Sequence, residues 1–533
     1  MTQAPVDDLF HVYDTTLRDG AQREGITYSV DDKLAVARLL DQFGVGFIEG
    51  GWPGALPTDT EFFARAKNEL VLENALLVAF GATRRANSAV EEDPQVQALL
   101  DSQAPVITIV AKSDVRHVHE ALRTTREENL AMVRDTVAYL VAHGRRVFVD
   151  LEHFFDGYNA DPDYGVSLLQ VADAAGAEVG VLCDTNGGML PSGIARVVSA
   201  VRERVDVRLG IHCQDDTGCA VANTIAAVES GVTHAQCTAN GYGERTGNAD
   251  LFAVVGNLET KLGMQVMPDG RLREMVRVSH ALAEIANLPP DTHQPYVGVS
   301  SFAHKAGLHA SALKVNADLY HHVDPTVVGN DMRILVTEMA GRASIELKGR
   351  ELGYDLATQP DVLTRVVERV KDLESRGWSF EAADASFELL LLDEIAGERR
   401  RFFRVESWRA IVEQTEDGRV LSEATVKVHA AGHRIISTGE GNGPVNALDN
   451  ALRAALVQIY PELNRLELVD YKVRILAGIK GTGAVTRTLV ETSNGRDRWD
   501  TVGVHENVIA ASWNALEDAV AYGLLRSGVE PGG

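Results

Sequence analysis

The stretch GIHCQDDTGCA at residues 210–220 combines residue types that could bind a metal ion. His212 and Gln214 are two positions apart, so on a β-strand their side chains project from the same face. A second histidine at this spacing would complete a pair of imidazole ligands, whereas this chain offers one imidazole and one carboxamide. The pattern allows three interpretations: a metal site with an unusual ligand, a site that has lost a ligand, or no site at all.

A second candidate metal-binding segment lies near the N-terminus, in YDTTLRDGAQ at residues 13–22. Arg18 would supply a fixed positive charge, and Asp19 would supply a hard oxygen ligand. Carboxylate and imidazole together suit a divalent cation such as Mg²⁺, Mn²⁺ or Zn²⁺. The alternative is a surface salt bridge followed by a turn at Asp19-Gly20.

Two further polar residues follow apolar runs. Glu152 ends the run RVFVDLE, where a carboxylate can act as a base or orient water or a metal-bound ligand. Thr185 follows VGVLCD, where its hydroxyl can donate to a substrate carboxylate or serve as an ordinary turn hydroxyl.

The elements that carry these residues follow a regular rhythm, in which short β-branched apolar runs alternate with amphipathic helical stretches. Such alternation implies right-handed crossovers and a parallel sheet. Eight units within about 280 residues fit a (β/α)₈ TIM barrel. An open doubly wound sheet would normally carry a glycine-rich phosphate loop after an early strand, and the sequence has none there. The eight runs lie at 11–17, 44–52, 75–80, 106–113, 146–154, 179–187, 207–216 and 234–243.

Polar and ionisable residues cluster where these runs end. In a barrel, the C-terminal ends of all strands converge on one mouth, which is where active sites of this fold lie. The candidate residues therefore should meet at that mouth. The strand-end residues are Arg18, Asp19, Glu49, Lys112, Glu152, His153, Asp184, Thr185, Asn186, residues 212–216 and Asn240.

Beyond the barrel, the pattern changes twice. The proline-rich segment NLPPDTHQPYVG reads as a linker. We expect a catalytic barrel at 1–285, mainly helical linker subdomains at 286–402, and an α+β regulatory domain at 403–528 whose two halves each run strand–strand–helix. The segment GEGNGP at 439–444 is a weak anion-loop signal, and a turn feeding a helix explains it better.

Composition excludes some partners and compartments. The net charge of −25 argues against nucleic acid or an anionic membrane as a partner. The four cysteines form no C-x-x-C pair, which fits a reducing cytoplasm. The N-terminus lacks a basic region followed by an apolar core, so we expect no signal peptide, and no apolar run approaches the roughly 18 residues of a membrane helix.

Several long motifs resemble one enzyme family. DTTLRDGAQ, IEGGWPGALPTDTEFF, CDTNGG, AVANTIAAV, NGYGERTGNADL and FAHKAGLHASAL are similar to the 2-isopropylmalate, homocitrate and citramalate synthases. This family and the hydroxymethylglutaryl-CoA lyases form the DRE-TIM metallolyases. GWPGALPTDTEFF, LEHFFDGY and WDTVGVHENVIAASW most resemble the long-type citramalate synthases. Lyases of this group generally lack the C-terminal regulatory domain, so residues 403–528 favour a synthase.

The resemblance implies a metal site. Asp19 matches the family's metal-ligand aspartate, and His212 matches its first metal histidine. Gln214 falls on the second metal histidine, and Asn248 matches an asparagine near the metal. The implied cofactor is a divalent metal ion, Mg²⁺ or Mn²⁺ first and Zn²⁺ as an alternative.

The resemblance also implies roles in binding and catalysis. Arg18 matches the arginine that polarises the keto oxygen. Glu152 matches a glutamate near the keto acid, and Thr185 matches the threonine that holds its carboxylate. His309 matches the histidine that helps to deprotonate acetyl-CoA, and Tyr320 matches a tyrosine nearby. In the family, these last two often reach the partner subunit's site.

The implied reaction is a Claisen-type condensation of acetyl-CoA with pyruvate and water, which gives (R)-citramalate and CoA on a route to isoleucine. The alternatives are condensation with another 2-keto acid, as in 2-isopropylmalate or homocitrate synthases, and an inactive amino-acid-sensing protein. The resemblance of the C-terminal domain implies a homodimer that binds an end-product amino acid, with isoleucine as the candidate.

Gln214 is the main departure from the family pattern. Its carboxamide oxygen could coordinate directly and favour Mg²⁺ or Mn²⁺ over Zn²⁺. Alternatively, water replaces the ligand and affinity falls, or the barrel is inactive. Asp216 would lie on the same face if the strand continued that far, and it could assist directly or through a water.

Overall fold

The computed structural model describes residues 9–399, 401–476 and 484–531. The chain divides into two compact units. The first comprises Met1–Phe302 and Val323–Asp331, and the second comprises Ala303–His322 and Met332–Gly533.

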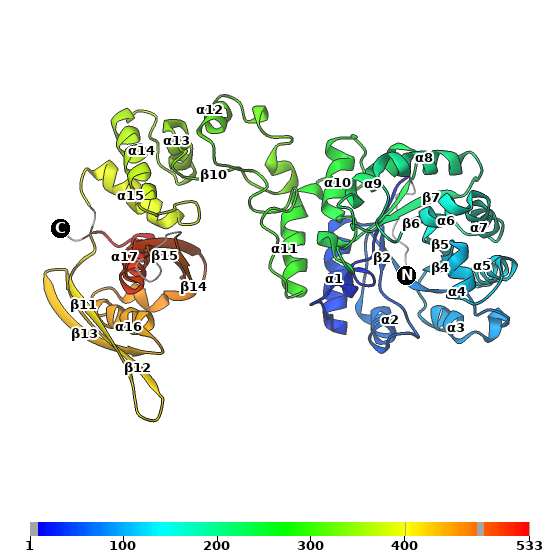
Figure 1. Cartoon of the computed structure of the whole chain (residues 1–533), viewed down its shortest axis with the longest axis horizontal. Coiled ribbons are helices and arrows are strands. Elements are labelled where there is room, and N and C mark those ends of the chain that lie inside the picture. Colours follow the sequence, from blue (N-terminus) through cyan, green and yellow to red (C-terminus); the bar gives the residue numbers. More distant parts are fainter. Residues whose placement is uncertain (1–8, 400, 477–483, 532–533) are drawn as a thin grey trace. The chain divides into compact units, whose positions relative to one another are not determined.

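The first unit contains a closed barrel of eight parallel strands in sequence order (Figure 1). β1 pairs in parallel with β8 as well as with β2, and this pairing closes the sheet. Each of the eight apolar runs overlaps one strand, so the predicted (β/α)₈ fold is confirmed and the open doubly wound alternative is wrong. The strands are β1 (His11–Asp14), β2 (Phe47–Glu49), β3 (Leu76–Ala82), β4 (Val106–Lys112), β5 (Arg146–Glu152), β6 (Val179–Asp184), β7 (Arg208–Cys213) and β8 (His234–Cys237).

Helices connect and surround these strands, and local sequence signals fix their ends. Ser29 and Asp32 form a reciprocal capping box at the start of α1, and Gly44 ends that helix with a φ of 104°. The helices are α1 (Val30–Phe43), α2 (Pro57–Glu69), α3 (Pro94–Asp101), α4 (Val115–Glu120), α5 (Arg126–Ala142), α6 (Phe154–Ala160), α7 (Pro162–Ala174), α8 (Pro191–Arg202), α9 (Ala220–Glu229), α10 (Leu251–Thr260) and α11 (Met275–Ile285).

The barrel interior is a packed core and not a pore. Large side chains on alternating strand positions fill it and form one buried cluster, which includes Tyr13, Phe47, Val106, Phe148 and Val181. The polar residues therefore occupy the layer above this cluster, at the C-terminal ends of the strands.

A buried ion pair ties the ends of β1 and β2 together. Lys33 of α1 is paired with Asp59 of α2, and both side chains are about 5% exposed. Lys33 Nζ also donates to the carbonyl oxygens of Leu17 at 2.9 Å and of Gly50 at 3.0 Å. Asp59 Oδ2 accepts the backbone N–H of Trp52 at 2.7 Å. This lysine therefore fixes the backbone beside Arg18 and beside Glu49.

The second unit begins with a small helical region. β9 (Ala303–His304) and β10 (Arg333–Ile334) form a two-stranded parallel sheet. The helices are α12 (Gly307–Val315), α13 (Arg342–Glu351), α14 (Pro360–Ser375) and α15 (Asp384–Ala396). Buried Val362, Leu363, Val366 and Val370 give α14 an apolar stripe at helical spacing.

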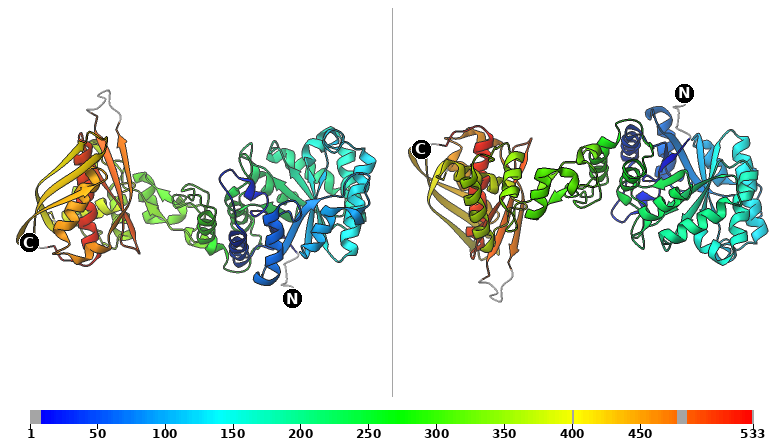
Figure 2. Two further views of the ribbon diagram at one scale, coloured as in Figure 1. Left: turned by 90° about the horizontal axis from the view of Figure 1, so that it is seen from below. Right: turned by 90° about the horizontal axis from the view of Figure 1, so that it is seen from above.

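The rest of the second unit contains two similar halves, each with a three-stranded antiparallel sheet covered on one face by a helix (Figure 2). This arrangement confirms the expected α+β domain and adds β11, an edge strand with mostly exposed side chains. The sequence YKVRILAG predicts a strand at 471–478. β14 ends at Ile475, and residues 477–478 lie outside the described part. The elements are β11 (Phe403–Gln414), β12 (Val420–Ala430), β13 (His433–Gly441), α16 (Pro444–Leu456), β14 (Glu467–Ile475), β15 (Thr486–Ser493), β16 (Arg498–His505) and α17 (Val508–Arg526).

In the described part of the chain, every helix is too short or too polar to cross a bilayer.

Candidate active site

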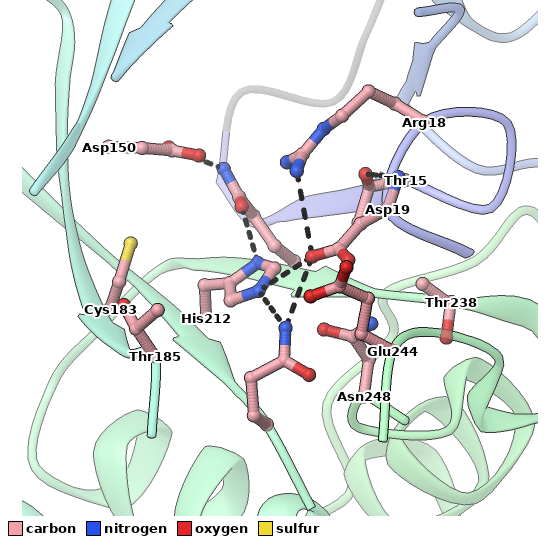
Figure 3. A network of polar contacts seen from close by, with 12 residues as sticks. Thr15, Arg18, Asp19, Asp150, Cys183, Thr185, His212, Thr238, Glu244 and Asn248 are labelled. Carbon is pink, nitrogen blue, oxygen red and sulfur yellow. Dashed lines mark hydrogen bonds and ion pairs between the residues drawn. The ribbon is translucent and has the colours of Figure 1, made fainter. Parts of the chain in front are cut away.

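A cavity of about 630 Å³ opens at the mouth of the barrel, among the C-terminal ends of the strands. It brings together six residues that the sequence predicted as one site, namely Arg18, Asp19, Glu152, Thr185, His212 and Gln214. Figure 3 shows the side chains of Arg18, Asp19 and His212 converging, with Asn248 beside them.

Arg18 is held as a fixed cation. Its Nε donates to Glu49 Oε2 at 2.6 Å, and its guanidinium carbon lies 3.9 Å from the centre of the Phe80 ring. Burial opposes the charge, but the carboxylates of Glu49 and Asp19 outweigh it and raise the pKa of the guanidinium. The positive charge at this point of the cavity is therefore permanent.

Glu49 holds the Arg18 side chain in position. Its side chain is fully buried at the end of β2 and also accepts hydrogen bonds from Thr15 Oγ1 and Tyr13 Oη, both at 2.5 Å. The sequence placed Glu49 among the strand-end residues without giving it a role. Its two oxygens take three donors, so the Arg18 side chain has one well-defined position.

Asp19, His212 and Gln214 present three atoms to a common point. Asp19 Oδ2 lies 3.2 Å from His212 Nε2 and 3.2 Å from Gln214 Nε2, and the two nitrogens are 3.3 Å apart. Burial alone would raise the pKa of Asp19, but Arg18 and His212 hold it well below its usual range. The carboxylate is therefore charged at neutral pH.

The residues present fit a divalent cation. Neighbouring ligands on an octahedral cation are roughly 3 Å apart, because each lies about 2.1 Å from the metal. Neither Gln214 Oε1 nor Asn248 Oδ1 accepts a hydrogen bond from any described residue, although both atoms are buried. A half-turn of the Gln214 amide would exchange Nε2 for this oxygen at the shared point.

The donor types define the site further. The described residues contain no group of three or more histidine, cysteine, aspartate or glutamate side chains that could hold a metal ion. Asp19 and His212 are the members of the predicted set with those side chains, and Gln214 and Asn248 would supply amide oxygens. Asn248 Nδ2 donates to the Tyr242 carbonyl oxygen at 2.9 Å, which fixes the direction of Oδ1. Three oxygens and one nitrogen suit a hard cation.

We expect Gln214→His to shift the metal preference toward Zn²⁺, by about tenfold in the ratio of Zn²⁺ to Mg²⁺ affinity, because imidazole suits borderline metals better than an amide oxygen does. Competition titrations on metal-free protein would measure this ratio. Gln214→Ala is the matched control and should weaken both metals. An unchanged ratio in Gln214→His would show that residue 214 is not a direct ligand.

Glu152 and Thr185 lie on neighbouring strand ends. Glu152 forms an ion pair with Lys112, the last residue of β4. Thr185 Oγ1 accepts the backbone N–H of His153 at 2.8 Å, so its own proton can be donated to a ligand. His153 reaches this position in the left-handed backbone region, with a φ of 59°.

Asp216 does not face the shared point. It forms a bidentate ion pair with Arg245, at 2.7 and 3.0 Å. β7 ends at Cys213, so the alternation of faces does not extend to residue 216. The suggested rescue by Asp216 is therefore wrong for this arrangement.

His212 contacts Gln236, and Gln236 contacts Asp150. Gln236 and Asp150 are both buried residues that the sequence pattern did not single out. His212 Nδ1 is 2.9 Å from Gln236 Oε1, and Gln236 Nε2 donates to Asp150 Oδ1 at 2.9 Å. Burial and the nearby Glu49 carboxylate raise the pKa of Asp150, whereas His212 and Arg18 oppose this shift. Their signal in the sequence was a polar residue inside an otherwise apolar strand, in RVFVDLE and in HAQC.

His309 and Tyr320 belong to the second unit, where the structure brings them together. His309 lies on α12, and its ring centre is 4.1 Å from that of Tyr320, with the rings stacked. His304 lies beside them, with its ring centre 5.9 Å from that of His309.

Three family models match consecutive parts of the chain. The HMGL-like family matches residues 10–282. The homocitrate synthase post-HMGL domain-like family matches residues 296–377, and the LeuA allosteric (dimerisation) domain matches residues 381–524.

Full-length relatives are similar along nearly the whole chain. An (R)-citramalate synthase of Streptomyces coelicolor is 67% identical over 526 residues, which is 99% of this chain and 98% of that protein. An (R)-citramalate synthase of Synechocystis sp. is 48% identical over 525 residues, 96% of each chain. One from Aquifex aeolicus is 46% identical over 518 residues, 97% of this chain and 98% of that protein.

Proposed function

The chain belongs to the (R)-citramalate synthase family, and we propose on that basis that it condenses acetyl-CoA with pyruvate and water to give (R)-citramalate and CoA. The observation that carries this proposal is 67% identity to an (R)-citramalate synthase over 99% of the chain. The barrel mouth supports it, because a fixed cation, a charged carboxylate and an imidazole meet there in one cavity.

We propose three domains with different roles, each formed by one consecutive segment of the chain. Residues 1–285 form the catalytic barrel, 286–402 form the linker subdomains that carry His309 and Tyr320, and 403–528 form the regulatory domain. The HMGL-like match at 10–282 and the LeuA match at 381–524 support this order.

The proposed cofactor is one divalent metal ion, with Mg²⁺ or Mn²⁺ favoured by the donor set and Zn²⁺ as the alternative. Asp19, His212, Gln214 and Asn248 would hold it. When bound, the ion would supply Lewis-acid polarisation of the keto acid's carbonyl.

The side chains at the mouth would bind and orient the keto acid. The Arg18 guanidinium places positive charge where the keto oxygen gains negative charge as the new carbon–carbon bond forms. The Thr185 hydroxyl donates to the keto acid's carboxylate, and Glu152 lies nearby as a proton acceptor or water-orienting group. Holding both substrates in one cavity supplies part of the rate through proximity.

The condensation needs acetyl-CoA, the keto acid and water as its reactants. His309, assisted by Tyr320, accepts a proton from the methyl group of acetyl-CoA. The resulting carbanion attacks the carbonyl carbon of pyruvate. The alkoxide becomes a hydroxyl by taking one proton from solvent, and His309 returns the proton that it accepted to solvent, so these two transfers cancel. Water then cleaves the thioester and releases CoA, and this hydrolysis makes the overall reaction favourable.

We expect CoA release from acetyl-CoA to depend on added pyruvate, because a small keto acid is the carbonyl partner proposed here. The measurement is thiol release with pyruvate, 2-ketoisovalerate and 2-ketoglutarate compared at equal concentration. Faster release with 2-ketoisovalerate or 2-ketoglutarate would indicate a 2-isopropylmalate or homocitrate synthase activity. No release with any of the three would indicate an inactive amino-acid sensor.

The proposed assembly is a homodimer, supported by the match to the LeuA dimerisation domain. The C-terminal sheets leave apolar side chains exposed, including Ile411, Leu421, Ile436, Val473 and Ile475. The proposed effector is an end-product amino acid, isoleucine, on a route that leads from pyruvate to isoleucine.

We further propose a cytoplasmic location. Cys183, Cys213, Cys219 and Cys237 all carry free thiols, and this is typical of a reducing compartment.

A further inference from the structure

The two ring nitrogens of His212 face different partners. Nε2 points at Asp19 Oδ2, 3.2 Å away, on the side where the cation ligands meet. Nδ1 lies 2.9 Å from Gln236 Oε1. An amide oxygen can only accept a hydrogen bond, so Nδ1 must carry a proton. In the neutral imidazole, the lone pair is therefore on Nε2.

The orientation of the Gln236 amide is fixed from its other end. Gln236 Nε2 donates to Asp150 Oδ1 at 2.9 Å. With Asp150 ionised, the opposite orientation would place the amide oxygen against the carboxylate, which repels it, and would turn an N–H toward His212. The carboxylate of Asp150 thus determines which atom His212 meets. Figure 3 shows the contacts that lead from Asp150 to His212.

The barrel holds all three residues rigidly. His212 on β7 and Gln236 on β8 are register partners in a parallel pair, and Asp150 is on β5. Their exposed fractions are 5%, 1% and 4%. One series of hydrogen bonds, called the relay below, runs across the barrel interior through Asp150, Gln236 and His212. These three side chains lie on three different strands, and all are buried.

The relay matters because the proposed cation site has a weak donor set. His212 would be its one imidazole, and Gln214 and Asn248 are neutral amides. Hydrogen bonding to the far nitrogen of a metal-binding histidine orients the ring and increases its basicity. A site with a single imidazole depends more strongly on such support than a site with two histidines and a carboxylate.

We propose that Gln236 and Asp150 are positioning residues that hold His212 in the Nδ1–H tautomer and thereby set the metal affinity of the site. The inference rests on the metal site of the proposed function and adds two residues to it. Neither residue needs to touch substrate or metal.

The test is Mn²⁺ binding by the full-length, metal-stripped protein, measured by calorimetric titration. Gln236→Met removes the acceptor at nearly constant volume, and Asp150→Asn removes the carboxylate that orients the amide. Each should weaken Mn²⁺ binding by about ten- to a hundredfold. Because both act through one path, Asp150→Asn should add little in the Gln236→Met background.

A charge-exchanged double variant separates this role from general damage to the core. In Asp150→Asn/Gln236→Glu, the new Glu carboxylate can accept both from His212 Nδ1–H and from the new Asn amide. It keeps the net charge of the wild type and should restore Mn²⁺ affinity to within about threefold. Affinity as weak as that of the single variants would overturn the proposal.

Asp14→Asn is the matched control. Asp14 is a buried barrel carboxylate that accepts from Thr16 N at 2.9 Å and Thr16 Oγ1 at 2.8 Å, outside the path to His212. It should leave Mn²⁺ affinity within about twofold. An equal loss in Asp14→Asn and Asp150→Asn would show that buried charge alone matters, and the relay would be wrong.

The binding assay does not require turnover, so the two proposals fail in different ways. Failure of all three keto acids to release CoA would refute the synthase proposal and leave the relay standing if the affinity pattern holds. Unchanged Mn²⁺ affinity in Gln236→Met would refute the relay even in an active enzyme. A wild-type protein that binds no Mn²⁺ at millimolar concentration would refute the relay too.

Discussion

Asp19→Ala is expected to lower the rate of CoA release with pyruvate by about a thousandfold. Asp19 is the only charged ligand in the proposed cation set, and it lies 3.2 Å from His212 Nε2. Its removal would leave one imidazole and two neutral amides, which bind a divalent cation weakly. Steady-state kinetics at saturating Mg²⁺ would measure the loss, and titration with Mn²⁺ would show the matching loss of affinity.

Asp216→Asn provides the control for this loss. Asp216 is also a carboxylate at the mouth, but it pairs with Arg245 and faces away from the shared point. Its variant should keep CoA release within about threefold of the wild type, as expected for a partly exposed ion pair. More than a tenth of the wild-type rate in Asp19→Ala would show that Asp19 is not an essential ligand.

Lys33→Met is expected to lower the free energy of unfolding by about 3–5 kcal/mol, because it leaves the Asp59 carboxylate buried without its partner. The variant also removes the donor to the carbonyl oxygens of Leu17 and Gly50. Urea denaturation of the full chain would measure the change, with Trp52 fluorescence contributing to the signal from the barrel.

Two variants give this prediction its controls. Lys33→Met/Asp59→Asn removes both charges, and it should recover much of the loss because no unpaired charge remains. Arg65→Met breaks a surface ion pair with Glu69 and should hardly move the denaturation midpoint. A Lys33→Met midpoint equal to that of Arg65→Met would show that the buried pair does not hold β1 and β2 together.

The barrel could be predicted because each strand is short, apolar and separated from the next by an amphipathic helix. That pattern depends on burial on both faces of a parallel sheet, which leaves a strong signal in the sequence. β11 left a weak signal, because it is an edge strand whose side chains are mostly exposed. The sequence therefore predicts no strand at 403–414, although these residues lie within the expected regulatory domain.

The residues of the candidate site also fall into two groups, those that the sequence pattern could predict and those that it could not. Arg18, Asp19, Glu152, Thr185 and His212 could be placed at one mouth because barrel topology brings strand ends together. The roles of Glu49, Gln236 and Asp150 could not, because each depends on a side-chain hydrogen bond between strands far apart in the sequence. Asp216 was misjudged because the alternation of faces stops where β7 ends, at Cys213.

The left-handed backbone at His153 constrains how this position can vary during evolution. With a φ of 59°, the backbone at residue 153 suits glycine, asparagine or aspartate, whereas a β-branched residue would be strained there. The backbone N–H of residue 153 donates to Thr185 Oγ1, so this contact can persist when the side chain is replaced. The contact with Thr185 therefore depends on the backbone conformation of residue 153, whereas the imidazole stacks on the ring of His117.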